Sequence, residues 1–225
     1  MDTKDLREQL KRRFPIADRT IALTHRQITV TVIDDPDHLL EKLSTEEHDG
    51  TLHLPYWTYL WPSSIGLAHY LDQIGTLTGQ QILEIGCGLG LAGIVGCQKG
   101  GRAIFTDYKR DALMFAQYNA LQNGCIDRAS FVQMDWNTPC LKRQFSRILA
   151  SDVIYEEKNW QPLLALIHRY LTADGEAVFS EPGRSGASGF LERISHHGLI
   201  YREHKYVVFP EERPSTICVY CVRWS

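Results

Sequence analysis

A short apolar run, Ile82–Ile85, leads directly into the glycine-rich stretch G-C-G-L-G-L-A-G at residues 86–93. Glycine costs about 1 kcal/mol relative to alanine in regular structure, so three glycines at alternate positions indicate a backbone that turns tightly or lets a ligand approach closely. A helix-like segment, Leu91–Lys99, follows. A glycine turn between a strand and a helix is typical of the first βα unit of a doubly wound sheet, where nucleotide ligands bind.

The rest of the chain alternates in the same way between short apolar runs and helical periodicity. Such alternation indicates βαβ units and a mostly parallel sheet with helices on both faces. The last two apolar runs have no helix between them and predict a terminal antiparallel hairpin. The sequence therefore predicts an α/β fold with a seven-stranded sheet. The predicted strands are Ile82–Ile85, Ala103–Asp107, Ser130–Met134, Arg147–Ile154, Glu176–Ser180, Leu199–Phe209 and Thr216–Trp224, and the predicted helices between them are Leu91–Lys99, Arg110–Asn123, Trp160–Leu171 and Gly189–His196.

The first 50 residues are predicted to form an extension that contains a helix and a β-hairpin. Leu6, Leu10 and Phe14 fall on one stripe of a helix over Thr3–Phe14. The β-branched run Ile28–Asp34 reads as a strand that pairs with Arg19–Leu23. We therefore divide the chain into an extension at residues 1–50 and the main α/β domain at residues 51–225.

Composition excludes several classes of protein. The 225 residues carry a net charge of −3, so bulk charge indicates neither a nucleic-acid nor a membrane partner. We expect no transmembrane helix and no secretory signal, because no run of 18 apolar residues occurs and the first 14 residues lack an apolar core.

Cys218 and Cys221 lie three positions apart in a strand-like run and should face opposite sides, which disfavours a metal or disulfide site. Reduced thiols and a cytoplasmic location are predicted.

The residues around the glycine turn favour a nucleoside with a cationic tail over a dinucleotide. The dinucleotide fingerprint has a small residue at its sixth position, where this chain has Leu91. Glu84, two residues before the first glycine, would repel a pyrophosphate and attract a cation. Asp107 ends the next strand 21 positions after Gly86, which suits an acid that accepts both ribose hydroxyls. S-adenosylmethionine (SAM) is a molecule of this kind.

A third strand end carries residues suited to an adenine. Asp135 can accept a hydrogen bond from the amino group, and the indole of Trp136 can pack on the base. Three alternatives stay open at this point: a glycine turn with no ligand, a core role for Trp136, and a dinucleotide oxidoreductase, which Leu91 and Glu84 disfavour.

These residues resemble a known family. The sequence E-I-G-C-G-L-G at 84–90, Asp107 and the pair D-W at 135–136 are similar to the first three motifs of Rossmann-like, seven-strand SAM-dependent methyltransferases. The tryptophan-containing segment at 57–71 and A-S-D-V-I-Y-E at 150–156 resemble the lysine methyltransferase family with a D-x-x-Y motif. That family includes the valosin-containing-protein, calmodulin and electron-transfer-flavoprotein β-subunit methyltransferases. The resemblance covers about residues 50–225.

The resemblance implies methyl transfer from SAM to an amine nitrogen, with S-adenosylhomocysteine (SAH) as product and a protein lysine as the leading acceptor. It assigns Asp152 to orientation of the incoming nitrogen and Tyr155 to an aromatic wall of the same pocket. The predicted cofactor-binding residues are Trp61, Glu84, Gly86, Gly88, Gly90, Asp107, Tyr108, Asp135, Trp136 and Ser151.

Other readings remain open from the sequence. Glu181, after the fifth strand, could serve in place of Asp152 or cap a turn. A small-molecule N- or O-methyltransferase, acting on a small amine for example, would use the same cofactor site, and so would a non-catalytic module that binds SAM or SAH. We expect a monomer.

Overall fold

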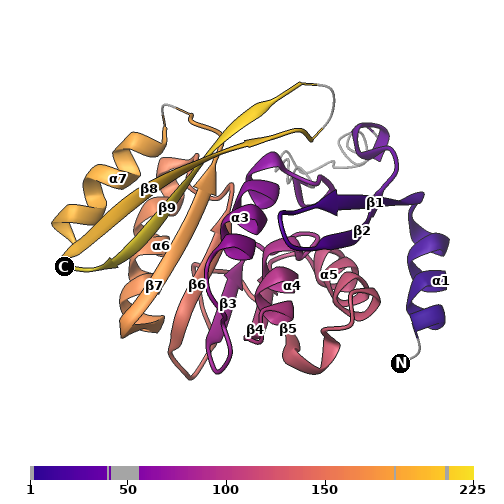
Figure 1. Cartoon of the computed structure of the whole chain (residues 1–225), viewed down its shortest axis with the longest axis horizontal. Coiled ribbons are helices and arrows are strands. Elements are labelled where there is room, and N and C mark those ends of the chain that lie inside the picture. Colours follow the sequence, from indigo (N-terminus) through magenta and orange to yellow (C-terminus); the bar gives the residue numbers. More distant parts are fainter. Residues whose placement is uncertain (1–2, 40, 42–55, 185, 211–212) are drawn as a thin grey trace.

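The computed structural model describes residues 3–39, 41, 56–184, 186–210 and 213–225. Seven strands form one sheet in the order β5-β4-β3-β6-β7-β9-β8, parallel from β5 to β7 and antiparallel at β9 and β8 (Figure 1). The predicted α/β fold with its closing hairpin is confirmed. The strands are β3 (Gln81–Ile85), β4 (Arg102–Asp107), β5 (Ala129–Gln133), β6 (Phe145–Ser151), β7 (Leu171–Glu181), β8 (Leu199–Val208) and β9 (Ser215–Trp224).

Helices cover both faces of this sheet. On one face lie α3 (Pro62–Gln73), α4 (Leu91–Gln98) and α5 (Arg110–Gln122), and on the other lie α6 (Glu157–Tyr170) and α7 (Ala187–His196). Each face has its own apolar core, because successive side chains of a strand point in opposite directions. Short 3-10 turns occur at Tyr56–Thr58 and Ile126–Arg128. None of the described helices is both long and apolar enough to cross a membrane.

The two cysteines of the C-x-x-C sequence lie on opposite sides of β9, as strand periodicity predicts. Cys221 belongs to the core under α3, α4 and α5, and Cys218 to the core under α6 and α7. All six cysteines are free thiols. The strand therefore uses these two side chains for packing on both sheet faces.

The predicted start of the fifth strand is wrong. The sequence predicts a helix that ends at Leu171 and a strand that begins at Glu176, which leaves Asp174-Gly175 between them, yet β7 starts at Leu171 and runs through both residues. Pairing with β6 passes from Phe145–Leu171 to Arg147–Glu176, so β7 bulges between its two paired ends. Gly175 fits this bulge because a Cβ there would come within 2.8 Å of Leu171 Cδ1. Tertiary pairing at both ends of the segment overrides the local turn signal.

The N-terminal extension packs onto α5. It consists of α1 (Thr3–Arg13) and a two-stranded antiparallel sheet, β1 (Ile16–Ala22) with β2 (Gln27–Ile33). The predicted helix and hairpin are therefore present. Apolar side chains of both elements join the core under α3, α4 and α5: Leu6, Leu10, Ile28, Val30 and Val32. The predicted boundary between residues 50 and 51 lies outside the described residues.

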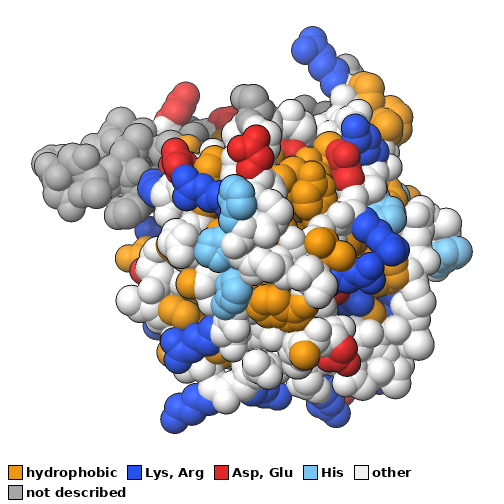
Figure 2. Space-filling view, turned by 90° about the vertical axis from the view of Figure 1, so that its left-hand side faces the viewer, with side chains coloured by type: hydrophobic (Ala, Val, Ile, Leu, Met, Phe, Trp, Pro, Cys, Tyr) orange, Lys and Arg blue, Asp and Glu red, His pale blue; other side chains and the backbone are white. Residues whose placement is uncertain are grey.

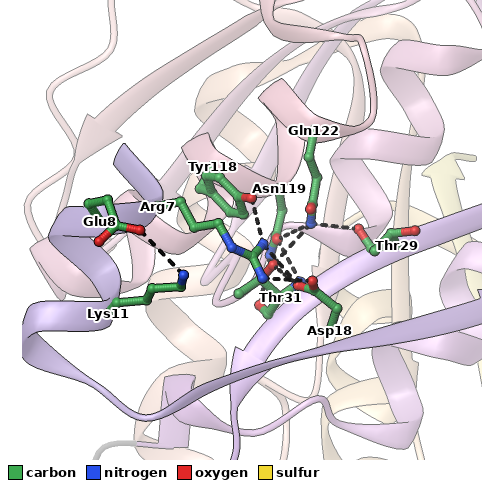
Figure 3. Close-up of polar contacts among 9 residues, drawn as sticks. All are labelled: Arg7, Glu8, Lys11, Asp18, Thr29, Thr31, Tyr118, Asn119 and Gln122. Atoms are coloured by element: carbon green, nitrogen blue, oxygen red, sulfur yellow. Dashed lines mark hydrogen bonds and ion pairs between the residues drawn. The ribbon is translucent and has the colours of Figure 1, made fainter. Parts of the chain in front are cut away.

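Polar contacts fix the extension to α5 (Figure 3). Arg7 pairs with Asp18 at 2.8 Å and donates to the Tyr118 hydroxyl at 2.7 Å. Asn119 is fully buried and accepts a hydrogen bond from the backbone N–H of Thr31 at 2.8 Å. Its amide nitrogen donates to the carbonyls of Thr31 and Leu89 at 3.2 and 3.0 Å. One side chain thus joins β2 to the glycine turn that follows β3.

Charges of both signs are mixed on the surface. Figure 2 shows the face that lies on the left of Figure 1, where basic, acidic and histidine side chains alternate with small apolar patches. Several basic residues there and elsewhere sit in ion pairs, for example Arg193 with Glu157 at 2.6 Å. This mixture agrees with the formal net charge of −3.

Asn119→Leu should lower the free energy of unfolding by at least about 2 kcal/mol, because leucine leaves buried N–H and C=O groups of Thr31 and Leu89 without partners. Urea denaturation measures the change. Asn137→Ala is the control: Asn137 is exposed, so its loss should change the stability by no more than about 0.5 kcal/mol. Equal effects of the two substitutions would contradict a bridging role for Asn119.

Candidate cofactor and acceptor site

A pocket of about 390 Å³ lies where the parallel strands end at their carboxyl edge. Parallel sheets bind ligands at this edge, near the point where the strand order reverses. Here the order reverses between β3 and β6. Ten of the twelve residues predicted for the site line this pocket: Trp61, Gly86, Gly88, Gly90, Asp107, Tyr108, Trp136, Ser151, Asp152 and Tyr155.

The glycine turn shapes one wall of the pocket. Gly86, Gly88 and Gly90 have φ of 59°, 51° and 81°, in a region that residues other than glycine rarely adopt. A Cβ on Gly86 would lie 3.2 Å from Trp136 Cζ3 and 3.4 Å from Val153 Cγ1. The turn therefore needs glycine for its backbone conformation and also for the close approach of Trp136.

Asp107 ends β4 and closes the turn from the other side. Its carboxylate accepts hydrogen bonds from the backbone N–H groups of Gly88 at 3.0 Å and Lys109 at 2.9 Å. Burial raises the pKa of Asp107, while these N–H groups act in the opposite direction. The side chain is buried in the protein yet lines the pocket, so its carboxylate can accept hydrogen bonds from ligand hydroxyls.

Glu84 does not line the pocket. Its side chain points from β3 into the core, where it is 3% exposed and accepts a hydrogen bond from the N–H of Gly93 at 3.1 Å. Burial raises the pKa of Glu84 from 4.5 to about 8. The sequence places this acid next to the turn, but strand alternation directs it beneath α4. Any influence on a bound cation would act through α4 and the turn.

Asp135 also lies outside the pocket lining. One of its oxygens accepts hydrogen bonds from the backbone and side-chain nitrogens of Asn137, at 2.8 and 2.7 Å. This local turn orients the neighbouring Trp136, which does line the pocket. Sequence reasoning placed both residues at a base, whereas the structure brings only the indole to the pocket wall.

Asp152 follows β6 and has the only positive φ among the described non-glycine residues, 56°. Its N–H donates to the Ser180 carbonyl at 2.8 Å, and its side chain is 7% exposed. The carboxylate forms an ion pair with Arg184 and accepts a longer hydrogen bond from Ser63 at 3.4 Å. Burial raises the pKa of Asp152, and the Arg184 charge opposes this shift. Strained backbone of this kind is found at functional sites.

Tyr155 stands beside Asp152 at the pocket mouth. The side chain is 39% exposed, and burial of the remainder raises the pKa of its phenol to about 12. The guanidinium of Arg184 lies 5.6 Å from its ring centroid, within cation–π range. The D-x-x-Y motif therefore presents a carboxylate and an aromatic face to the same space.

The tryptophan segment before α3 supplies the opposite wall. Trp61 donates its indole N–H to the Tyr56 carbonyl at 2.7 Å, and both residues line the pocket. Trp57 lines the pocket as well, and its ring also packs on Phe14 and Phe115. Trp57 therefore belongs both to the core and to the pocket wall.

Glu181 is not a substitute for Asp152. It is 2% exposed and accepts hydrogen bonds from the Arg184 N–H at 2.7 Å and the Tyr220 hydroxyl at 3.3 Å. It therefore caps the turn after β7, which was the other reading of the sequence. Arg184 itself was missed, because a single arginine after a strand carries no recognisable motif.

Comparison with known proteins identifies the family of this chain. A profile of the lysine methyltransferase family matches residues 42–197. The chain belongs to the lysine methyltransferase family. It is 37% identical to a histidine protein methyltransferase 1 homolog of Dictyostelium discoideum over 54% of this chain and 41% of that protein. It is 31% identical to the protein-lysine methyltransferase METTL21E of Mus musculus over 48% and 49%.

The alignments span only 41–60% of the length of the first curated relatives. Solved structures agree in fold. A TehB-like SAM-dependent methyltransferase from Corynebacterium glutamicum has a TM-score of 0.55 and 24% identity over 71% of this chain and 88% of that chain. A magnesium protoporphyrin IX methyltransferase from Synechocystis, crystallised with SAM, has a TM-score of 0.57 and 18% identity over 70% and 76%. The predicted family and the predicted fold are confirmed.

The Glu84→Gln variant should become increasingly more stable than the wild type as the pH rises. Between pH 4.5 and about 8 the folded protein keeps a proton on Glu84 that the unfolded chain has released, so this group's contribution to stability declines across that window. Glutamine does not titrate, so urea denaturation from about pH 5 to about pH 8 should show a widening advantage for the variant. A difference that does not vary with pH would contradict the raised pKa.

Proposed function

We propose that this protein transfers the methyl group of SAM to a side-chain nitrogen of another protein, with lysine as the acceptor. The observation that carries the proposal is the arrangement of two carboxylates along one pocket. Asp107 lies at the glycine turn, and Asp152 follows β6 and lies close to Tyr155; all three residues line the pocket. An acid at the glycine turn can accept hydrogen bonds from the ribose of a nucleoside, and a second acid can accept one from the acceptor nitrogen.

The residues of the pocket fit the cofactor. Asp107 is positioned to accept from the ribose hydroxyls, Trp136 offers an aromatic face to the base, and the glycines keep the wall free of side chains. When bound, SAM supplies a methyl group that is already activated by its sulfonium, so the protein mainly contributes position and exclusion of water. Asp152 would accept a hydrogen bond from the acceptor nitrogen, and Tyr155 would flank it.

A protein acceptor is favoured over a small molecule by the character of the pocket mouth. Three aromatic side chains that line the pocket are substantially exposed: Tyr56 at 44%, Tyr108 at 56% and Tyr155 at 39%. Exposed aromatic side chains around a cavity are typical of surfaces that bind another protein. Three of the curated relatives carry names that specify a protein acceptor. They are a histidine protein methyltransferase, a protein-lysine methyltransferase and a histone-arginine methyltransferase.

We also propose a cytoplasmic monomer without a nucleic-acid or membrane partner. The six free cysteines, five of them buried, support a reducing compartment. The net charge of −3 supports the absence of a general attraction to nucleic acid.

Asp107→Asn should weaken cofactor binding, because an amide offers one acceptor oxygen in place of two. For the wild-type protein, a hundredfold excess of SAH over its Kd should add about 2.7 kcal/mol of stability, seen as a rise in Tm. At the same SAH concentration the variant should show a clearly smaller rise. Asp127→Asn, an exposed acid outside the pocket, serves as control. A full shift in the Asp107 variant would remove this residue from the cofactor site.

Incubation of a cell lysate with tritiated SAM and the protein should label a protein band on a gel. Asp152→Asn should reduce that label by about a hundredfold or more while SAH still raises the Tm, since an orienting base typically contributes this much to the rate. Label confined to small molecules would support the alternative acceptor class. Full labelling by the variant would exclude Asp152 from the reaction.

A further inference from the structure

A second cavity of about 220 Å³ adjoins the first at Asp152. Its lining residues are Tyr56, Trp61, Asp152, Tyr155 and Arg184. All of them except Arg184 also line the larger pocket. Because the two cavities share these walls, a side chain that enters the smaller one reaches the carboxylate proposed to orient the acceptor. The smaller cavity is therefore the acceptor subsite of the proposed reaction.

This subsite already holds a cation from the protein itself. The guanidinium of Arg184 forms an ion pair with the Asp152 carboxylate and lies 5.6 Å from the ring centroid of Tyr155. These are the two contacts that a protonated acceptor amine would make on arrival. Arg184 and a cationic acceptor thus compete for one carboxylate and one aromatic face.

The two partners of this ion pair differ in their exposure. The side chain of Asp152 is 7% exposed, whereas that of Arg184 is 42% exposed. A buried carboxylate that loses its cation is left unpaired at high cost, while an exposed guanidinium can move into water. The backbone N–H of Arg184 stays bound to Glu181, so only its side chain needs to move. Exchange is therefore favourable only when the newcomer also brings a positive charge.

The charge state of the acceptor fits such an exchange. An unperturbed lysine has a pKa near 10.4, so nearly all of it is ammonium at pH 7. An ammonium can take over the partnership with Asp152 as Arg184 withdraws. A hydroxyl, or an amine of low basicity, would leave the carboxylate without a counter-charge.

We propose that Arg184 is a placeholder for the cation of the methyl acceptor: it occupies the Asp152 carboxylate and the Tyr155 ring until a cationic side chain displaces it. This inference rests on the proposed function, since it assigns the smaller cavity to the acceptor. Arg184 acts here as a competitor: it weakens the binding of cationic acceptors, which must displace it from Asp152, and leaves nearly unchanged the binding of neutral side chains, which do not displace it.

The test measures binding of two probes to the protein saturated with SAH. The cationic probe is Nα-acetyl-lysine methylamide, and the neutral probe is Nα-acetyl-norleucine methylamide, which lacks the ammonium. Arg184→Gln should bind the lysine probe about three- to tenfold more tightly than the wild type, which corresponds to loss of a partly exposed competing ion pair. Affinity for the norleucine probe should change by less than twofold.

Arg193→Gln is a matched control. Arg193 is also 42% exposed, forms an ion pair with Glu157 and lies 5.1 Å from the Trp160 ring, but it lines neither cavity. Its probe affinities should equal those of the wild type. If Arg184→Gln fails to bind SAH, Arg184→Met replaces it in the same titration.

Unchanged, weaker or undetectable binding of the lysine probe by the Arg184 variant would overturn the proposal. An equal gain in affinity for both probes would also overturn it, because that result would indicate a larger cavity rather than the release of the Asp152 carboxylate from Arg184. Failure of the proposed function would be seen in a different measurement. The wild-type protein would transfer no tritium from SAM in the lysate assay, independently of how the two probes bind.

Discussion

The glycine turn after β3 is the constraint on which the rest of the site depends. Its backbone adopts positive φ at Gly86, Gly88 and Gly90, and this geometry turns the Gly88 N–H toward Asp107. The Leu89 carbonyl of the same turn accepts from Asn119, which also holds β2. A change in the turn would therefore alter the pocket wall, the position of Asp107 and the attachment of the N-terminal extension together.

Four buried acids lie at or near the carboxyl edge, and their environments give them different roles. Glu84 is beneath α4, and its pKa is raised to about 8 by burial. Asp107 is held by backbone N–H groups and faces the pocket. Asp152 pairs with Arg184, whose side chain is 42% exposed, while Glu181 accepts hydrogen bonds from the Arg184 N–H and the Tyr220 hydroxyl. Of these four acids, only Asp107 and Asp152 can contact a ligand, because only they line the pocket.

The residues proposed for cofactor recognition and those proposed for acceptor recognition come from different parts of the fold. The parallel strands β3 and β4 lead into the residues proposed to hold SAM. Residues after β6 and β7, together with Tyr56 and Trp61 before α3, surround the smaller cavity. Relatives whose names specify lysine, arginine or histidine match this one chain. Under the proposed assignment of the smaller cavity to the acceptor, such differences would arise around that cavity rather than at the glycine turn.

The sequence by itself determined the strand and helix alternation, the closing hairpin, the glycine turn and ten of the residues that line the pocket. These features are local: strand periodicity, glycine spacing and the position of an acid at a strand end are properties of consecutive residues. Tertiary structure alone decided that β7 continues through Asp174-Gly175, that Glu84 and Asp135 point away from the pocket, and that Arg184 reaches Asp152. Each of these depends on which segments pack side by side, and Arg184 and Asp152 are 32 positions apart in the chain.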